Sequence, residues 1–224
     1  MLGDVLLITE KHKKAAKAIV EHVGTMAGDK IIIAVGGESG SGKSELGHEI
    51  ARLLKGKATP AKIMHIDNYY KTSAAERNPW RKEHGVESIG YTEYDWDAIN
   101  RNMAEFRKDK DDVIMPCIDL LTDQKDQLHT SFEGLRYMVI EGLYAVKAEA
   151  DLRVFIDLTY HETKKAQLVR GKEKMNEWRL QVLQREHEVV RSLRPLADLL
   201  VRPDFEVVDT RFNAEAQSSR DAEK

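Results

Sequence analysis

The chain has 224 residues and a formal net charge of −3, with 42% hydrophobic and 33% charged residues. These values exclude a collagenous or broadly disordered chain and are typical of a globular protein. The charge balance also excludes a bulk positive field that would attract nucleic acid or anionic lipid, so any bound anion needs a local site.

Cysteine content and hydropathy give the expected compartment. The single cysteine, Cys117, cannot form an internal disulfide, and no Cys/His cluster has zinc-ligand spacing. The first residues have too short an apolar run for a signal peptide, and no stretch approaches the roughly eighteen apolar residues that cross a bilayer. We therefore expect a cytoplasmic protein with no nucleic-acid and no membrane partner.

The first third of the chain contains the pattern of an α/β protein. Apolar spacing predicts a leading helix over Glu10–Met26, and a buried strand at Ile31–Val35 follows it. A second helix is predicted from about Lys43 to Leu54, and a second strand over Lys62–Ile66. Strand, glycine loop, helix and strand within about forty residues form a βαβ unit, which predicts the α/β class.

The remaining chain carries further strand and helix patterns. The predicted strands are Val113–Met115, Tyr137–Ile140, Leu152–Ile156 and Phe205–Val208, and the predicted helices lie near Trp96–Asp109 and Met175–Leu193. We expect one domain over residues 1–212, followed by a polar, disordered tail over 213–224.

A phosphate-loop pattern of eight residues stands between the first strand and the second helix. Its glycines let successive backbone N–H groups turn toward phosphates at a helix N-terminus, where the partial charge is positive. We expect Lys43 to neutralise β- and γ-phosphate oxygens and Ser44 to ligate Mg²⁺. The loop predicted to bind a nucleoside triphosphate comprises Gly37, Glu38, Ser39, Gly40, Ser41, Gly42, Lys43 and Ser44.

A phosphate loop alone does not separate kinases from GTPases or transport ATPases. The chain has no Asn-Lys-x-Asp guanine motif and no Leu-Ser-Gly-Gly-Gln signature. The strand Tyr137–Ile140 ends in Glu141-Gly142, where water-activating ATPases commonly have Asp-Glu. A lone acid there can hold the water shell of Mg²⁺ without acting as a hydrolytic base. The alternative for Glu141 is an ordinary turn carboxylate.

A candidate acceptor site follows the second strand. Asp67 lies at the edge where parallel sheets place ligands, and its carboxylate can accept a proton from an attacking hydroxyl or cap a turn. Six of the fifteen aromatic residues lie between Asp67 and Trp96, within the predicted acceptor segment 67–100. Polar-tipped rings are typical of small-ligand pockets, and a small aromatic core is the alternative. The predicted lining residues include Tyr69, Tyr70, Tyr91 and Trp96.

Residues 160–176 are locally basic in an acidic chain. This segment suits a lid whose cations close over the triphosphate, and a solvated helix face is the alternative for its lysines. Arg170 is the best candidate for a lid residue that contacts phosphate, because guanidinium geometry suits phosphate oxygens.

The chain resembles the uridine kinase and phosphoribulokinase group of P-loop kinases over about residues 30–208. The motifs that carry the resemblance are the phosphate loop, His65-Ile-Asp67-Asn-Tyr-Tyr70-Lys71, Glu93-Tyr-Asp95-Trp-Asp97-Ala98, Val139-Ile-Glu141-Gly142 and Ala197-Asp198. The resemblance implies a three-layer P-loop sandwich with a mostly parallel sheet and a helical lid. It also implies ATP- and Mg²⁺-dependent phosphoryl transfer to a hydroxyl, with Asp67 as base, Ser44 and Glu141 at the metal, and Arg170 in the lid.

One departure from that group concerns the acceptor. Uridine kinases usually carry a Tyr-Asp and then a His and an Arg that contact the nucleoside, where this chain keeps Asp119 and has Asp123 and Lys125. Nucleoside, sugar, sugar phosphate and polyol acceptors all stay open, but we expect uridine and cytidine to be poor. Asp95, Asp119 and Lys125 are predicted to contact a hydroxyl-rich acceptor, on which Lys125 can hold a phosphate or carboxylate.

Two further hypotheses remain. A nucleotide-dependent switch without transfer chemistry is the alternative function, and the intact Asp67 and Ser44 argue against it. The leading helix Glu10–Met26 is not part of the usual uridine kinase start, and it is expected to cover a sheet face or to serve a homodimer contact.

Overall fold

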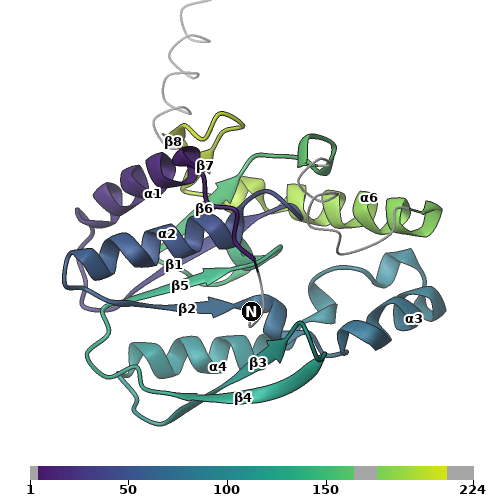
Figure 1. Ribbon diagram of the computed structural model, residues 1–224, viewed down its shortest axis with the longest axis horizontal. Coiled ribbons are helices and arrows are strands. Elements are labelled where there is room, and N and C mark those ends of the chain that lie inside the picture. The colour runs from purple at the N-terminus through teal and green to yellow at the C-terminus, as the bar shows by residue number, and fades with distance from the viewer. Residues whose placement is uncertain (1–4, 164–175, 211–224) are drawn as a thin grey trace, which may run out of the picture.

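A six-stranded sheet with the order β2-β5-β1-β6-β7-β8 forms the middle layer of the computed structural model, which describes residues 5–163 and 176–210 (Figure 1). The strands are β1 (Ile31–Gly37), β2 (Ala61–His65), β5 (Tyr137–Glu141), β6 (Leu152–Ile156), β7 (Leu199–Val201) and β8 (Val207–Asp209). All neighbouring pairs are parallel except β7 and β8. The predicted α/β class with a mostly parallel sheet is confirmed.

Two helices cover one face of this sheet. Helix α1 (Glu10–Val23) packs along α2 (Lys43–Gly56), and their apolar side chains share one core cluster with Ile31, Ile33 and Val35 of β1. The leading helix therefore covers the same face of the sheet as α2, which agrees with the expectation that it covers a sheet face. It ends three residues earlier than predicted.

The other face of the sheet carries a second layer. Helices α4 (Trp96–Arg107) and α6 (Glu177–Ser192) pack in a core cluster with Ile32 and Ala34 of β1, so alternate residues of β1 face opposite layers. An antiparallel hairpin of β3 (Val113–Asp119) and β4 (Gln124–Thr130) flanks α4. Helix α3 (Ala74–His84) extends beside α6 beyond the carboxyl ends of the strands (Figure 1).

Several elements differ from the sequence prediction. Helix α3 was not predicted, although Ser73 and Glu76 form a capping box at its start, because Arg81 is its one buried residue and Pro79 lies inside it. Strand β4 has no buried residue and therefore shows no alternating pattern. The predicted strand at Phe205–Val208 begins two residues later, since Phe205 has φ +67° and its N–H donates to the Arg202 carbonyl oxygen.

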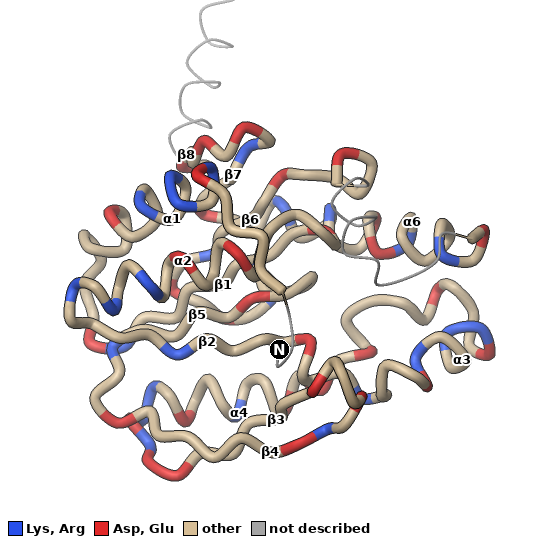
Figure 2. The backbone as a smooth tube through the Cα atoms, in the orientation of Figure 1, with Lys and Arg blue, Asp and Glu red and all other residues tan. Residues whose placement is uncertain are grey.

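The charged residues are spread over the whole molecule. Figure 2 shows Lys and Arg interleaved with Asp and Glu on each labelled helix, in keeping with the small net charge. Within residues 5–163 and 176–210, no helix is both long enough and apolar enough to cross a membrane.

Strand order determines which loops meet. The predicted βαβ unit joins β1 to β2, but β5 lies between these two strands. Glu141 at the end of β5 is in register with Val35 of β1 on one side and with His65 of β2 on the other. The three carboxyl ends consequently bring the phosphate loop, Glu141 and Asp67 to one edge of the sheet.

The turn after β5 depends on close backbone packing at Gly142. This glycine has φ +153°, its N–H donates to the Val35 carbonyl oxygen, and a Cβ placed on it would lie 2.2 Å from Ile66 Cγ1. Ile66 belongs to the 3₁₀ turn Ile66–Tyr69 that carries Asp67. Gly142 thus allows the Glu141 turn and the Asp67 turn to touch.

Gly142→Ala is expected to destabilise the protein by about 1–3 kcal/mol, because the added methyl group overpacks against Ile66 and the backbone is strained for alanine. Urea unfolding measures the change. Gly56→Ala is the control, since nothing lies within 4 Å of a Cβ there. Equal stability of the Gly142 variant and the native chain would contradict the packing argument.

Candidate active site

The phosphate loop joins β1 to α2 in a conformation that requires glycine. Gly37, Gly40 and Gly42 have φ of +147°, +77° and +94°. A Cβ on Gly37 would lie 2.9 Å from the Ile156 carbonyl oxygen, and one on Gly42 would lie 2.5 Å from His12 Nε2. The backbone can therefore approach a bound group closely, as phosphate loops do.

Two side chains of the loop fit an anionic ligand. The Ser41 hydroxyl is buried and has no hydrogen-bond partner in the described parts of the chain, which suits a donor for phosphate oxygen. Lys43 is buried, and its Nζ donates to the Glu38 carbonyl oxygen at 2.8 Å, which places its charge inside the loop. The loop can thus hold the phosphates of a nucleotide.

Ser44 and Glu141, the predicted metal pair, are brought together. Ser44 Oγ donates to Glu141 Oε2 at 3.1 Å, and His65 Nδ1 lies 2.5 Å from Glu141 Oε1. Burial raises the pKa of Glu141. The hydrogen bond and charge of His65, the charge of Lys43 and the hydrogen bond from Ser44 lower it by more, so the net pKa of Glu141 lies below the ordinary glutamate value. Glu141 is therefore an ionised carboxylate.

These oxygens fit Mg²⁺ only together with phosphate oxygens. In the described residues, no group of three or more His, Cys, Asp or Glu side chains could hold a metal ion alone. Mg²⁺ accepts one or two protein ligands plus substrate phosphates and water, which Ser44 and Glu141 beside the loop can complete. The sequence motif contains His65, but its contact with Glu141 is not predictable from spacing, because it depends on the register of β2 with β5.

Asp67 lies next to this pair with a different electrostatic environment. Tyr94 donates its hydroxyl to Asp67 Oδ1 at 3.1 Å. Burial and the charge of Glu141 raise the pKa of Asp67, and Lys43, Arg77 and Tyr94 oppose that shift only in part. Two neighbouring carboxyl groups whose pKa values move in opposite directions are suited to different tasks, one to accept a proton and the other to remain ionised.

Tyr70 and Tyr94 form the aromatic wall beside Asp67. Their backbones pair at an isolated bridge, and their ring centroids lie 4.1 Å apart. Burial raises the pKa of both hydroxyls, so both stay neutral donors. The guanidinium of Arg77, from the unpredicted helix α3, lies 3.3 Å from the Tyr70 ring centroid.

The other predicted aromatic residues are engaged elsewhere. Tyr69 is buried in the core and donates its hydroxyl to Asn102 Oδ1 of α4 at 2.7 Å. Tyr91 pairs with Ser192 at the end of α6, and Trp96 Nε1 donates to the Tyr91 carbonyl oxygen. Their polar atoms join the 67–100 segment to α4, to α6 and to itself, as expected if these rings form a small aromatic core.

The predicted polar acceptor residues also have structural partners. Asp95 caps α4 by accepting from the Ala98 N–H, and Asp119 accepts from the Leu121 N–H in the β3–β4 turn. Lys125 Nζ donates to the Tyr70 carbonyl oxygen at 3.5 Å. Of Asp95, Asp119 and Lys125, Lys125 thus contacts a residue of the aromatic wall beside Asp67. Arg170 and most of the predicted lid lie outside the described residues.

Glu38 connects the phosphate loop to the segment after β6 and to α6. Its buried carboxylate accepts from the Tyr160 N–H at 2.6 Å and pairs with His187 Nδ1 at 2.7 Å. Thr163 Oγ1 also donates to the Ser39 carbonyl oxygen. The Glu38 side chain therefore connects the phosphate loop to Tyr160 and His187.

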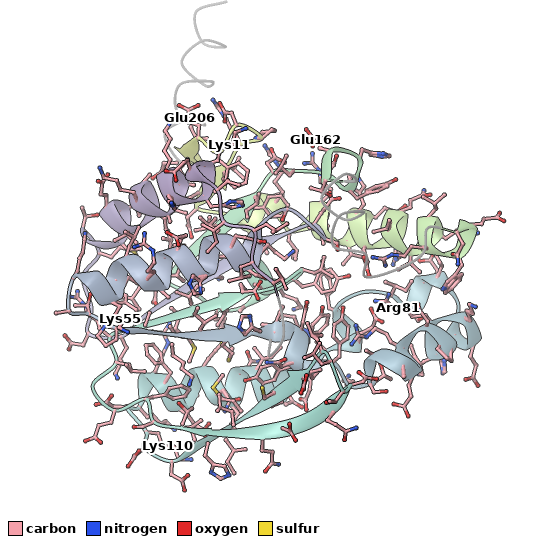
Figure 3. All side chains as sticks on the ribbon, viewed as in Figure 1. Lys11, Lys55, Arg81, Lys110, Glu162 and Glu206 are labelled. Carbon is pink, nitrogen blue, oxygen red and sulfur yellow. The ribbon has the colours of Figure 1, made fainter. Side chains whose placement is uncertain are left out.

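A buried ion-pair cluster links α3 to α6. Arg81, labelled in Figure 3, donates two hydrogen bonds to Glu93, at 2.6 and 2.9 Å, and lies 3.2 Å from Glu186 of α6. All three side chains are buried. The cluster fixes α3 relative to the rest of the acceptor segment.

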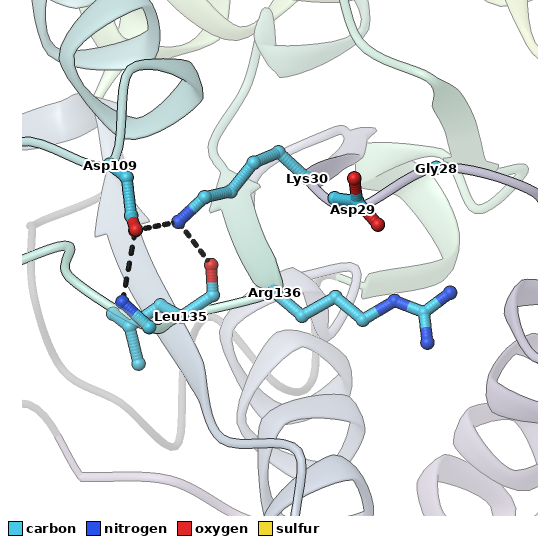
Figure 4. Close-up of a pocket in the computed structure, with 7 residues that line it drawn as sticks. Gly28, Asp29, Lys30, Asp109, Leu135 and Arg136 are labelled. Atoms are coloured by element: carbon cyan, nitrogen blue, oxygen red, sulfur yellow. Dashed lines mark hydrogen bonds and ion pairs between the residues drawn. The ribbon is translucent and has the colours of Figure 1, made fainter.

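A separate surface cavity of about 400 Å³ lies at the opposite edge of the sheet, where β1 and β5 begin (Figure 4). Lys30 in this cavity pairs with Asp109 and donates to the Leu135 carbonyl oxygen at 2.7 Å. These contacts join the starts of the two strands, so Lys30 has a structural role far from the phosphate loop.

Comparisons with known proteins match this arrangement. The model of the "Phosphoribulokinase / Uridine kinase family" matches residues 32–173, which confirms the resemblance. A bifunctional alpha-galactosidase/sucrose kinase of Mediterraneibacter gnavus is 25% identical over 82% of this chain and 21% of its own length. A uridine kinase of Ureaplasma urealyticum is 26% identical over 57% of this chain and 62% of its own length. The chain thus spans less than two thirds of these relatives.

The fold is similar to that of a solved phosphoribulokinase from Rhodobacter spheroides. The TM-score is 0.59 and the sequence identity is 14%, over 78% of this chain and 70% of that one. At this identity the likeness concerns the fold, and it agrees with the mostly parallel sheet described above.

Asp67→Asn is expected to raise the melting temperature at neutral pH. The folded pKa of Asp67 lies above its unfolded value, so folding disfavours the charged form, and stability is lost as pH rises through this range. The gain should vanish below the unfolded pKa, where Asp67 is protonated in both states. Thermal unfolding at neutral and acidic pH tests this, with exposed Asp126→Asn as control. A melting temperature of Asp67→Asn below that of the native chain at neutral pH would contradict the raised pKa of Asp67.

Proposed function

This chain belongs to the phosphoribulokinase/uridine kinase family, and we propose that it is an ATP- and Mg²⁺-dependent kinase that phosphorylates a hydroxyl of a small molecule. The observation that carries the proposal is the pair of carboxyl groups beside the phosphate loop. Glu141 has a lowered pKa and bonds Ser44, whereas Asp67 has a raised pKa and faces Tyr94. This division suits a metal ligand and a general base.

In the proposed reaction, the loop holds the triphosphate of ATP, and Lys43 neutralises its β- and γ-phosphate oxygens. Asp67 accepts the proton of the acceptor hydroxyl, whose oxygen forms a bond to the γ-phosphorus. The bond from that phosphorus to the β–γ bridging oxygen breaks, and ADP leaves. Mg²⁺ held by Ser44 and Glu141 would supply charge neutralisation at the phosphates.

The Tyr94 hydroxyl supports the proposed role of Asp67. Its hydrogen bond to Oδ1 orients the carboxyl group, and in the described residues no hydrogen bond occupies Oδ2. Oδ2 is therefore the oxygen we assign to the incoming proton. The charges of Lys43 and Arg77 favour the ionised form of Asp67 and so oppose part of the rise in its pKa that burial causes.

We propose that the acceptor is hydroxyl-rich and is not a pyrimidine nucleoside. The similar proteins named above act, by their names, on sucrose, uridine and a ribulose phosphate. In the described acceptor segment, Tyr69, Tyr91 and Trp96 form hydrogen bonds with other protein groups. The rings that lie beside Asp67 are those of Tyr70 and Tyr94, which pack against each other. We also propose that one kinase domain spans residues 1–212, with a lid over 160–176 that contributes Arg170.

Product identification tests the proposed function. The protein is incubated with Mg²⁺, γ-¹⁸O-labelled ATP and a pool of sugars, sugar phosphates, polyols and nucleosides, and mass spectrometry follows the label. The proposal predicts a labelled phosphomonoester and one ADP per ester. ATP turnover that yields inorganic phosphate alone and ignores the pool would favour the nucleotide-dependent switch.

Lys43→Met should lower acceptor-dependent ADP formation by at least about 100-fold, because the lysine charge stabilises the transferring phosphoryl group. The variant keeps the buried methylene stem but loses the hydrogen bond from Nζ to the Glu38 carbonyl oxygen, so it should stay folded with a stability loss of about 1 kcal/mol. Lys55→Met is the matched control, since Lys55 is exposed in the last turn of the same helix. Full activity of the Lys43 variant would refute the phosphate-loop assignment.

A further inference from the structure

Arg77 of α3 carries a positive charge that forms no ion pair with a carboxylate of the described residues. Its guanidinium lies 3.3 Å from the Tyr70 ring centroid, and its Nε is buried with no hydrogen-bond partner in residues 5–163 and 176–210. No carboxylate in these ranges forms an ion pair with it. By contrast Arg81, one turn later on the same helix, is paired with both Glu93 and Glu186.

The position of Arg77 relates it to the proposed acceptor site. Tyr70, on which it stacks, packs against Tyr94, and Tyr94 bonds Asp67. The charge of Arg77 acts on Asp67 and lowers its pKa. Arg77 therefore packs on the Tyr70 ring, close enough for its charge to act on the proposed base Asp67.

The helix that carries Arg77 is held in place on several sides. Ser73 and Glu76 cap its start, and the Ala75 N–H donates to Asp123 Oδ2 in the β3–β4 turn at 3.3 Å. The Arg81 cluster fixes its last turns to Glu93 and to α6. A guanidinium held on a fixed helix and a packed ring is pre-organised, so it loses little freedom when it binds.

A second cation, Lys125, contacts the backbone of the same tyrosine. Lys125 Nζ donates to the Tyr70 carbonyl oxygen at 3.5 Å, while Arg77 covers the ring. A half-buried guanidinium without a counter-ion is costly, and an anionic ligand group with two oxygens would satisfy its paired N–H donors.

We propose that Arg77, assisted by Lys125, forms a subsite for an anionic group on the acceptor, so that the substrate is a hydroxy compound bearing a phosphate or a carboxylate. This inference rests on the proposed kinase function and names the substrate class of the same site. A neutral sugar or a polyol would leave the guanidinium without a counter-ion, and it should be the weaker acceptor.

Binding of inorganic phosphate tests the subsite without knowledge of the acceptor. Isothermal titration is performed on the full chain saturated with Mg²⁺ and the β,γ-methylene analogue of ATP, which occupies the phosphate loop. The native chain should bind one phosphate, and Arg77→Gln should weaken binding at least tenfold. Lys82→Gln removes one charge from an exposed position of the same helix and should change binding less than twofold.

Arg77→Lys separates charge from geometry. It keeps the positive charge but loses the paired donors, so its phosphate affinity should fall between those of the native chain and Arg77→Gln. Unchanged nucleotide affinity in both variants shows that they are folded. Absence of phosphate binding to the native chain, or equal affinity in native chain and Arg77→Gln, would overturn the subsite.

Matched acceptor pairs separate this inference from the proposed function. Glycerol is compared with D-glycerate, and D-ribulose with its 5-phosphate, so that carboxylate and phosphate are tested apart. The anionic member should have at least tenfold higher kcat/KM, and Arg77→Gln should remove that advantage through acceptor KM. Transfer that prefers neutral members in both pairs overturns the subsite and leaves the kinase proposal intact. Phosphate binding that depends on Arg77 without transfer to any acceptor contradicts the kinase proposal alone.

Discussion

The position of β5 between β1 and β2 is the constraint on which the site depends. It places Glu141 in register with both Val35 and His65, so one residue meets the phosphate loop on one side and the Asp67 turn on the other. Gly142 then allows the two turns to touch, because any Cβ there would collide with Ile66. Sheet order and the absence of a side chain at Gly142 thus bring together the phosphate loop, the proposed metal ligand Glu141 and the proposed base Asp67, although Ser44 and Glu141 lie 97 residues apart in the sequence.

The two carboxyl groups at this edge illustrate how surroundings set function. Glu141 is buried and Asp67 is half-buried, and withdrawal from water alone raises the pKa of each. Glu141 has His65, Ser44 and Lys43 nearby, and these return it to the ionised state. Asp67 has one hydroxyl partner and the negative charge of Glu141, so it takes up a proton more readily. A protein optimised for stability alone would avoid this pair, which makes a functional role the better explanation.

Sequence patterns predict the phosphate loop, Glu141 and Asp67 as site candidates, because spacing along the chain is enough to single them out, and the structure places all three at one edge of the sheet. The strand buried on both faces and the long helices were also predictable, since their periodicity is strong. Arg77 and His65 were not, because their roles depend on an unpredicted helix and on strand register. The same holds for Glu38, whose side chain is used by Tyr160 and His187. Long-range contacts of this kind leave no local pattern.

The pH dependence of phosphoryl transfer tests the central claim, that Asp67 is the base, most directly. Turnover of the acceptor is measured at saturating ATP and acceptor. We predict that the rate of the native chain rises with pH through the raised pKa of Asp67, above the ordinary aspartate range. Asp67→Asn should be about 100- to 10,000-fold slower, without this acidic limb. An acidic limb that persists unchanged in the Asp67→Asn variant would contradict the account.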